Sequence, residues 1–299
     1  MKAAFFDIDG TLKPFNEIEL RDTTIAMLHA LQEKGIKVFL ASGRPPVQLP
    51  LLGKKLNAFP WDGYVLLNGQ YVMDKDKHCF YKLPICKEAL HSLVPWLKEN
   101  ADYACTFMEE NDSYDITFNK AHYEYLKSIG KEDYMLRVED PVRSYTHDTY
   151  QICPRIPSKD DAEWVKHAPG MKSARWTEEF ADMIPLEGGK PVGMQKILDY
   201  YGIDQKDTIA FGDGGNDMTM LEFAEIGVAM GNANDEVKSH ADYVTDTSEN
   251  DGILKAFQHF VIGYISKMVN SRNRINEKII FLHVSNTEEI CDLMHSFLD

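Results

Sequence analysis

The chain has 299 residues, a formal net charge of −15 and 44% hydrophobic residues. This composition is too apolar for a disordered chain, and the length suits one large or two ordinary domains. The acidic balance argues against a nucleic-acid partner, because binding to a phosphate backbone needs surface lysine and arginine. It leaves open a small phosphorylated ligand, for which a few local cations suffice.

The cysteines and the N-terminal segment favour a soluble, cytoplasmic protein. The five cysteines are odd in number and show no metal-site or redox spacing, so we expect reduced and mostly buried thiols. The N-terminal segment reaches a charge at Asp7, too soon for a signal peptide. No stretch approaches the roughly 18 apolar residues of a membrane span, so we expect no membrane partner.

Short apolar runs, each followed by a polar or glycine-rich cluster, predict strands that are buried on both faces of a parallel sheet. These runs are Ala3–Phe6, Val38–Leu40, Tyr64–Leu67, Thr208–Phe211 and Gly227–Met230. Helical patterns lie between them in Arg21–Lys34 and Pro191–Tyr201, and a glycine follows each helix as a C-terminal cap. The alternation predicts an α/β fold with a doubly wound, Rossmann-like parallel sheet.

The alternation breaks between about Leu83 and Leu186, where prolines mix with aromatic-rich runs. We therefore expect residues 83–186 to form a separate α+β domain. It would be inserted between two halves of the core, residues 1–82 and 187–260. Ligands of doubly wound sheets bind beyond the carboxyl ends of the strands, where the polar clusters of this chain fall.

Asp7 and Asp9 stand two apart at the end of the first predicted strand. In extended geometry both carboxylates point the same way and can divide a reaction between a nucleophile and an acid or base. A calcium loop that starts at Asp7 is excluded, because it needs glycine and glutamate where Leu12 and Ile18 stand. A solvated turn is the remaining alternative.

Asp213 and Asp217 lie in a glycine-rich turn after another predicted strand. Carboxylates gathered there with Asp7 and Asp9 repel one another unless a divalent cation lies between them, and oxygen ligands favour Mg²⁺. A loop shaped by its own aspartate side chains is the alternative.

Weaker signals lie at three other places in the chain. Ser42 and Gly43 offer a hydroxyl and an unhindered N–H to phosphoryl oxygens, and Arg44 adds a fork of donors. Lys190 opens a helix, where a cation works against the helix dipole, so either a functional role or a solvated side chain fits. Asn68 either binds a ligand or shapes the Asn-Gly turn, and the sequence favours the turn.

Four segments in this order and spacing resemble the motifs of the haloacid dehalogenase superfamily. They are Asp7–Thr11, Ser42–Arg44, Lys190 and Gly212–Asp217. An insertion between Ser42 and Lys190 resembles the cap domain of the Cof-type subgroup. Further matches extend the resemblance over roughly residues 1–260: Leu67–Gly69, Gly227–Asn232, Ala241–Thr245 and Asp251–Ile253. In the cap, Arg175-Trp176 and Phe180–Asp182 are similar to Cof-type hexose-phosphate phosphatases.

The resemblance implies a phosphatase that acts in two steps. Asp7 would attack phosphorus and form an aspartyl phosphate, while Asp9 would protonate the leaving alcohol and later accept a proton from water. A donor at pH 7 needs a pKa about 3 above that of free aspartic acid, which corresponds to roughly 4 kcal/mol. We expect burial and neighbouring carboxylates or phosphate to raise the pKa of Asp9 in this way once the cap closes.

The resemblance also implies the ligands of both the metal and the transferring group. Mg²⁺ would be held by Asp7, the backbone carbonyl of Asp9 and Asp213, and Asp217 would support that shell. The phosphoryl group would contact Ser42, Arg44, Lys190, Asn216 and the N–H groups of Ile8 and Gly43.

The expected partner is a small phosphorylated metabolite, with a sugar phosphate favoured. A phosphomutase with the same core and a non-catalytic protein that binds phosphometabolites are the alternatives. The motif carboxylates and Lys190 argue against the second, because a non-catalytic relative would be expected to have lost one of them.

Residues 261–299 fall outside the resemblance. Ile279–Val284 suggests a strand, Ser285–Glu288 has the spacing of a capping box, and an apolar helical stripe follows. Such a unit cannot bury its own faces, so it would dock on the core or cap, pair with another subunit or remain partly disordered. We expect a docking or self-association element, and an extension added by readthrough or cloning is the alternative. The oligomeric state stays open.

Overall fold

The computed structural model describes residues 1–100, 103–128 and 135–260. The predictions for residues 261–299 lie outside these ranges.

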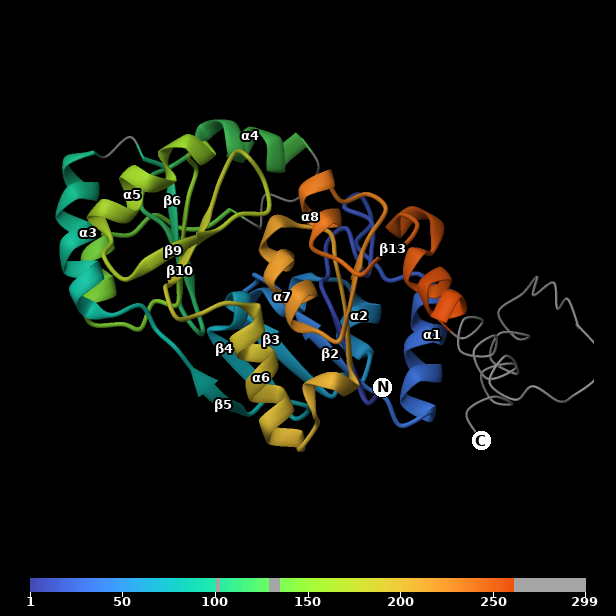
Figure 1. Cartoon of the computed structure of the whole chain (residues 1–299). Coiled ribbons are helices and arrows are strands. Elements are labelled where there is room, and N and C mark those ends of the chain that lie inside the picture. Colours follow the sequence, from blue (N-terminus) through green and yellow to red (C-terminus); the bar gives the residue numbers. More distant parts are fainter. Residues whose placement is uncertain (101–102, 129–134, 261–299) are drawn as a thin grey trace, which may run out of the picture.

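The larger layer of the molecule is an eight-stranded sheet in the order β13-β12-β11-β1-β2-β3-β4-β5 (Figure 1). Its strands are β1 (Ala3–Phe6), β2 (Lys37–Ala41), β3 (Gly63–Leu66), β4 (Tyr71–Asp74), β5 (Cys79–Lys82), β11 (Thr208–Gly212), β12 (Ile226–Ala229) and β13 (Tyr243–Val244). The first six strands in this order run parallel, and β4 and β5 add an antiparallel edge. The doubly wound α/β core is thus confirmed, with the predicted strands correct to within one residue at each end. The antiparallel edge was not predicted.

Helices cover both faces of this core sheet because neighbouring side chains of each strand point to opposite faces. Phe6 packs in the same cluster as Met27, Leu28 and Leu31 of the helix Asp22–Glu33. Phe5 packs in the other cluster, with Met194 and Leu221 of the helices on the opposite face. The core helices are α1 (Asp22–Glu33), α2 (Lys54–Ala58), α6 (Lys190–Tyr201), α7 (Met218–Phe223) and α8 (Asp235–Ser239). Gly35 and Gly202, with φ of +75° and +64°, stand at the ends of α1 and α6, as the sequence predicted.

Residues 105–185 contain a second, antiparallel sheet, the cap sheet, in the order β7-β6-β8-β10-β9. The strands are β6 (Cys105–Met108), β7 (Ser113–Asp115), β8 (Gln151–Pro154), β9 (Met171–Ala174) and β10 (Asp182–Pro185), and the helices are α3 (Lys87–Glu99), α4 (Lys120–Ser128) and α5 (Asp161–His167). The helices α3 and α5 lie beside this sheet (Figure 1). Their apolar side chains and those of one face of the sheet form one hydrophobic cluster. An inserted α+β unit therefore interrupts the core, and its boundaries at residues 83 and 186 stay a prediction.

The four cysteines in the described ranges are free thiols, as predicted. Cys105 and Cys153 are buried, whereas Cys79 is half-buried and Cys86 is exposed. No helix among the described residues is long and apolar enough to span a bilayer.

Candidate active site

The predicted strand-end residues meet around one cavity of about 820 Å³, which the cap sheet also lines. The core contributes side chains from the ends of three adjacent parallel strands, β1, β2 and β11, where ligands of such sheets bind. These lining residues are Asp7, Asp9, Ser42, Gly43, Arg44, Asp213, Asn216 and Asp217. Ile8 and Lys190 are buried next to them.

The floor of the cavity is built on Lys190, whose side chain is fully buried. Its Nζ donates to Asp7 Oδ1 at 2.7 Å, to Asp217 Oδ1 at 2.5 Å and to the carbonyl of Ala41 at 2.8 Å. Burial lowers the pKa of Lys190, but the two carboxylates outweigh burial and raise it above its ordinary value. Lys190 is thus a charged, fixed side chain, which excludes the solvated alternative.

Asp7 and Asp213 stand close enough to share a cation. Carboxylate oxygens of Asp7, Asp213 and Asp217 all lie within 4.8 Å of one another. Burial raises the pKa of Asp7 to about 7, against the pull of Lys190 and with added repulsion from Asp217. Burial and repulsion from Asp7 raise the pKa of Asp213 to about 8. An all-oxygen set of crowded, desolvated carboxylates fits a hard divalent cation.

Asp217 has a different position from its two neighbours. Its Oδ1 accepts from Lys190, and its Oδ2 accepts from the backbone N–H groups of Asp213 and Gly214 at 3.0 and 2.9 Å. Both oxygens are therefore engaged by donors of the protein. This geometry suits a carboxylate that orients Lys190 and the loop, in line with the supporting role expected for it.

The electrostatics of Asp9 differ from the expectation. Its carboxylate contacts Lys13 Nζ and Arg44 Nε, each at 2.7 Å. Burial raises its pKa, but the ion pairs with Arg44 and Lys13 prevail and lower the pKa to about 2. In this arrangement the pKa of Asp9 falls instead of rising, because two cations face its carboxylate. The rise expected once the cap closes over a phosphate stays a prediction. The two ion pairs therefore hold Asp9 ionised.

A buried hydrogen-bond network joins the core motifs to the cap through Asn68. Asn68 has a left-handed φ of 53° in the predicted turn, and it is 1% exposed. Its amide oxygen accepts from Asn216 at 3.0 Å, and its amide nitrogen donates to Gln151 and Asp182 at 2.9 and 2.8 Å. Gln151 in turn donates to the carbonyl of Gly43 at 3.3 Å. Asn68 therefore both shapes the turn and couples the loops that carry Gly43 and Asn216 to the cap.

Several residues of the site were not predicted from the sequence. Thr11 Oγ1 donates to Asp213 at 2.8 Å, and Asn232 donates to Asp213 at 3.2 Å and to the Gly10 carbonyl at 2.9 Å. Lys13 holds Asp9. Thr11 and Asn232 belonged to segments that matched the family, so that match was the available signal.

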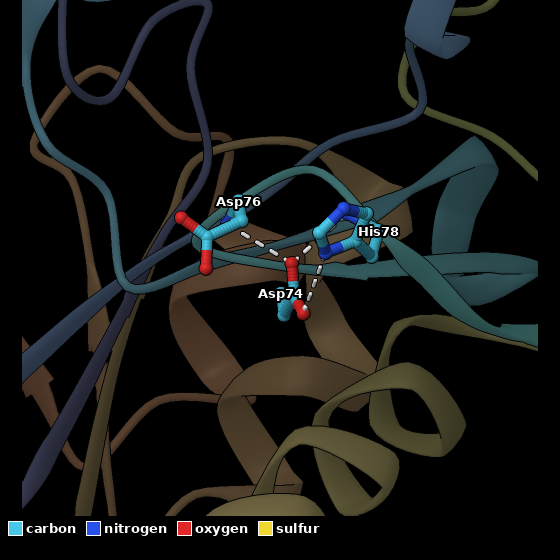
Figure 2. Close-up of side chains that lie close together, drawn as sticks. All are labelled: Asp74, Asp76 and His78. Atoms are coloured by element: carbon cyan, nitrogen blue, oxygen red, sulfur yellow. Dashed lines mark hydrogen bonds and ion pairs between the residues drawn. The ribbon is translucent and has the colours of Figure 1, made fainter.

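A second cluster of metal-ligand type lies in the β4–β5 turn, away from the cavity lining (Figure 2). Asp74 Oδ1 accepts from the backbone N–H groups of Asp76 and His78, both at 2.9 Å. Asp76 and His78 are exposed. These contacts are those of an aspartate-stabilised hairpin turn, and none of them is to a motif residue.

The chain belongs to the haloacid dehalogenase-like hydrolases, whose family profile matches residues 4–257. It is 32% identical over 257 residues to YkrA of Bacillus subtilis, provisionally named a phosphatase, with 85% of this chain and 96% of the relative covered. It is 25% identical to YcsE of the same organism, a 5-amino-6-(5-phospho-D-ribitylamino)uracil phosphatase, over 88% of this chain and 96% of that protein.

Solved structures agree with these relatives. The subclass IIB sugar phosphatase BT4131 superposes with a TM-score of 0.80 at 33% identity, covering 87% of this chain and 99% of that one. The phosphatase BT1666 of Bacteroides thetaiotaomicron gives a TM-score of 0.77 at 30% identity, with 87% and 95% covered. The fold, the motifs and these neighbours identify a Cof-type phosphatase, a phosphoric monoester hydrolase, as the sequence predicted.

Proposed function

We propose that this enzyme hydrolyses a small phosphorylated metabolite, with a sugar phosphate favoured, in a Mg²⁺-dependent reaction through an aspartyl phosphate on Asp7. The observation that carries the proposal is the setting of Asp7. Its carboxylate lines the cavity, is fixed by the buried Lys190 and lies beside Asp213. A nucleophile needs such a fixed orientation and an open approach, and the ion pair supplies the first while the cavity supplies the second.

In the first step an Asp7 carboxylate oxygen forms a bond to phosphorus as the bond from phosphorus to the ester oxygen breaks. The leaving alkoxide takes a proton from Asp9. In the second step a water oxygen attacks phosphorus and gives a proton to Asp9, as the bond between phosphorus and the Asp7 oxygen breaks. Inorganic phosphate leaves and the Asp7 carboxylate is restored. Lys190 supplies fixed positive charge beside the transferring group, and such charge dominates catalysis of phosphoryl transfer.

Asp9 has to be protonated before it can donate, and its ion pairs oppose this. A bound phosphate dianion competes with Asp9 for the forked donors of Arg44, which already reaches the cavity. Loss of the Arg44 contact and the nearby negative charge of the phosphate both raise the pKa of Asp9. Substrate binding thereby converts the ionised Asp9 into a proton donor.

Asp7, Asp213 and the backbone carbonyl of Asp9 are the ligands that we propose for Mg²⁺, with Asp217 behind them. The bound cation supplies charge neutralisation for the phosphoryl oxygens. Ser42, Arg44, Lys190, Asn216 and the N–H groups of Ile8 and Gly43 surround the same phosphoryl group.

Sugar phosphates are favoured because BT4131, which matches 87% of this chain, is a sugar phosphatase. A phosphorylated ribityl chain with a planar ring is the second candidate, as in the substrate that names YcsE. The aromatic side chains at the cavity favour a planar ring. Phe15 and Trp176 both line the cavity and stack at 6.2 Å with 11° between their planes, and Phe180 packs edge-on against Trp176.

The test is a phosphate-release screen of the wild-type protein over hexose phosphates, flavin mononucleotide, pyridoxal phosphate and nucleotides, with Mg²⁺ and with excess chelator. We expect Mg²⁺-dependent release of inorganic phosphate, fastest for one of the first two groups. Conversion of a sugar phosphate into its isomer without phosphate release would identify a mutase. Binding without turnover of any ester would identify a non-catalytic protein.

A further inference from the structure

The cap sheet presents a polar face to the cavity, and Arg155 extends that face. Along β8, Gln151 and Cys153 line the cavity, whereas Ile152 packs into the cap core. Arg155 follows two residues after Cys153, keeps the ladder by donating its N–H to the Ala104 carbonyl at 2.9 Å, and lines the cavity. This alternation of strand side chains places Arg155 on the cavity face.

Arg155 differs from the other arginines of the described residues. Each of those pairs with a carboxylate: Arg21 with Glu17, Arg44 with Asp9, Arg137 with Asp112, Arg143 with Glu109 and Arg175 with Asp161. No described carboxylate lies in ion-pair distance of Arg155, and its Nη1 is buried without a hydrogen-bond partner. A desolvated donor without an acceptor is unfavourable, so a ligand that supplies oxygen acceptors would be bound there.

The position of Arg155 in the cavity places its side chain near the leaving group of the substrate, away from the transferring phosphoryl group. Gln151, four residues earlier on the same face, reaches the Gly43 carbonyl in the phosphate-binding loop. At about 3.3 Å per residue, the backbone of Arg155 lies about 13 Å from that of Gln151 along the strand. The transferring phosphoryl group therefore lies at one end of the strand, and Arg155 faces the opposite end of the substrate.

The charges around Arg155 indicate what kind of acceptor it binds. Asp115 and Asp182 line the same cavity, Asp182 at the end near Gly43, where it accepts from Asn68, and Asp115 accepts from Thr106 Oγ1 at 2.5 Å. The cap therefore lines the cavity with two carboxylates and one guanidinium, and this negative balance disfavours a second anionic group on the substrate. We propose that Arg155 determines specificity by binding uncharged oxygen acceptors, hydroxyl or carbonyl groups, at the far end of the leaving group. This proposal rests on the proposed phosphatase function.

The test measures binding to Mg²⁺-loaded protein in an Asp7→Asn background, so that it does not depend on turnover. The probes are glucose 6-phosphate, flavin mononucleotide, 6-phosphogluconate, and phenyl phosphate, whose leaving group has no further oxygen. Arg155→Met should weaken binding of glucose 6-phosphate or flavin mononucleotide at least tenfold and that of phenyl phosphate less than twofold. Arg155→Lys should restore part of the affinity and guards against a variant that does not fold. Arg137→Met, which removes an exposed cap arginine, is the control and should leave the affinities for all these esters unchanged.

Equal weakening for phenyl phosphate, or no weakening for any ester, would overturn the proposal. The proposal would also be overturned if neither glucose 6-phosphate nor flavin mononucleotide binds the Asp7→Asn protein. Tightest binding of 6-phosphogluconate through Arg155 would overturn the uncharged character of the acceptor. If the wild-type protein releases no phosphate from any ester while the Arg155-dependent binding persists, the proposed function fails and the assignment of Arg155 stands.

Discussion

Asp7, Asp213 and Asp217 in the cavity and Asp74, Asp76 and His78 in the β4–β5 turn are the two acidic clusters of metal-ligand type among the described residues. Their composition is similar, but their surroundings differ. Asp7 and Asp213 are desolvated and crowd one another, so their pKa values rise. For Asp74, burial is outweighed by the N–H groups of His78 and Asp76, so its pKa falls. The first cluster therefore differs from the second because its carboxylates are buried with too few hydrogen-bond donors. This shortage of donors, more than the number of carboxylates, favours binding of a cation there.

The two clusters therefore act on stability with opposite signs. A carboxyl group whose pKa is raised in the folded protein destabilises the fold once the pH exceeds the pKa of that group in the unfolded chain. The loss of stability is complete above its pKa in the folded protein. A carboxyl group whose pKa is lowered stabilises the fold at the same pH. The metal-free active site is thus a strained region, as expected where function and stability conflict.

The largest contrast between the clusters should appear in turnover. Asp7→Asn removes the nucleophile while keeping the size of the side chain, so phosphate release should fall to a few per cent of wild type or less. Asp76→Asn is the matched control in the second cluster and should leave the rate unchanged. A steady-state assay of both purified variants on the best ester of the screen decides the matter, and an active Asp7→Asn protein would rule out the assigned nucleophile.

A smaller loss is expected at Asp9. Asp9→Asn removes the proton donor and acceptor, so kcat should fall about 10²–10⁴-fold for an alkyl phosphate. The loss should shrink for p-nitrophenyl phosphate, whose leaving group needs little protonation. The ratio of the two losses is the measurement. Equal losses for both esters would mean that Asp9 does not protonate the leaving group.

The strand-end residues could be predicted because the geometry of a parallel sheet brings them to one edge whatever the loops do. The side-chain partners could not. Lys13 reaches Asp9 because Gly10, with φ of +85°, turns the loop back, and a Cβ at Gly10 would overlap the Asp213 carboxylate. That turn adds Lys13 to Arg44, which is the stronger of the two cations that lower the pKa of Asp9.

The cap was harder to interpret from sequence for a different reason. Its cavity face consists of alternate residues on short strands, such as Gln151 and Cys153 on β8 and Arg155 just after it. A period-2 pattern over four or five residues carries little information, and its partners come from neighbouring strands that are distant in sequence. The packing of the cap sheet on the core decides which cap residues contact Asn68 and Gly43, and the sequence does not show this packing.

The increase in Tm on addition of Mg²⁺ should depend on pH in a way that reports the titration of Asp7 and Asp213. The folded pKa values of Asp7 and Asp213, about 7 and 8, exceed the unfolded value of 3.8, so the folded protein binds more protons and its stability in chelator falls as pH rises from about 4 to about 8. Mg²⁺ competes with those protons, so its stabilising shift in Tm should grow over the same range. Differential scanning fluorimetry in chelator and in excess Mg²⁺ measures both trends. A shift that is independent of pH would contradict carboxylate ligation at these two residues.

The smallest and most pointed effect concerns stability without metal. In chelator at a pH above about 8, Asp213→Asn removes a desolvated charge that repels Asp7, so Tm should rise by a few degrees although Mg²⁺ binding is lost. Asp74→Asn keeps the acceptor oxygen for the N–H groups of Asp76 and His78 but loses its charge. The free energy of unfolding should therefore fall by no more than about 1 kcal/mol, with a slightly lower Tm. At about pH 6 the gain from Asp213→Asn should shrink, because the wild-type carboxyl group is then protonated in the folded state. A drop in Tm for Asp213→Asn at high pH would show instead that the hydrogen bonds from Thr11 and Asn232 outweigh the cost of burying that charge.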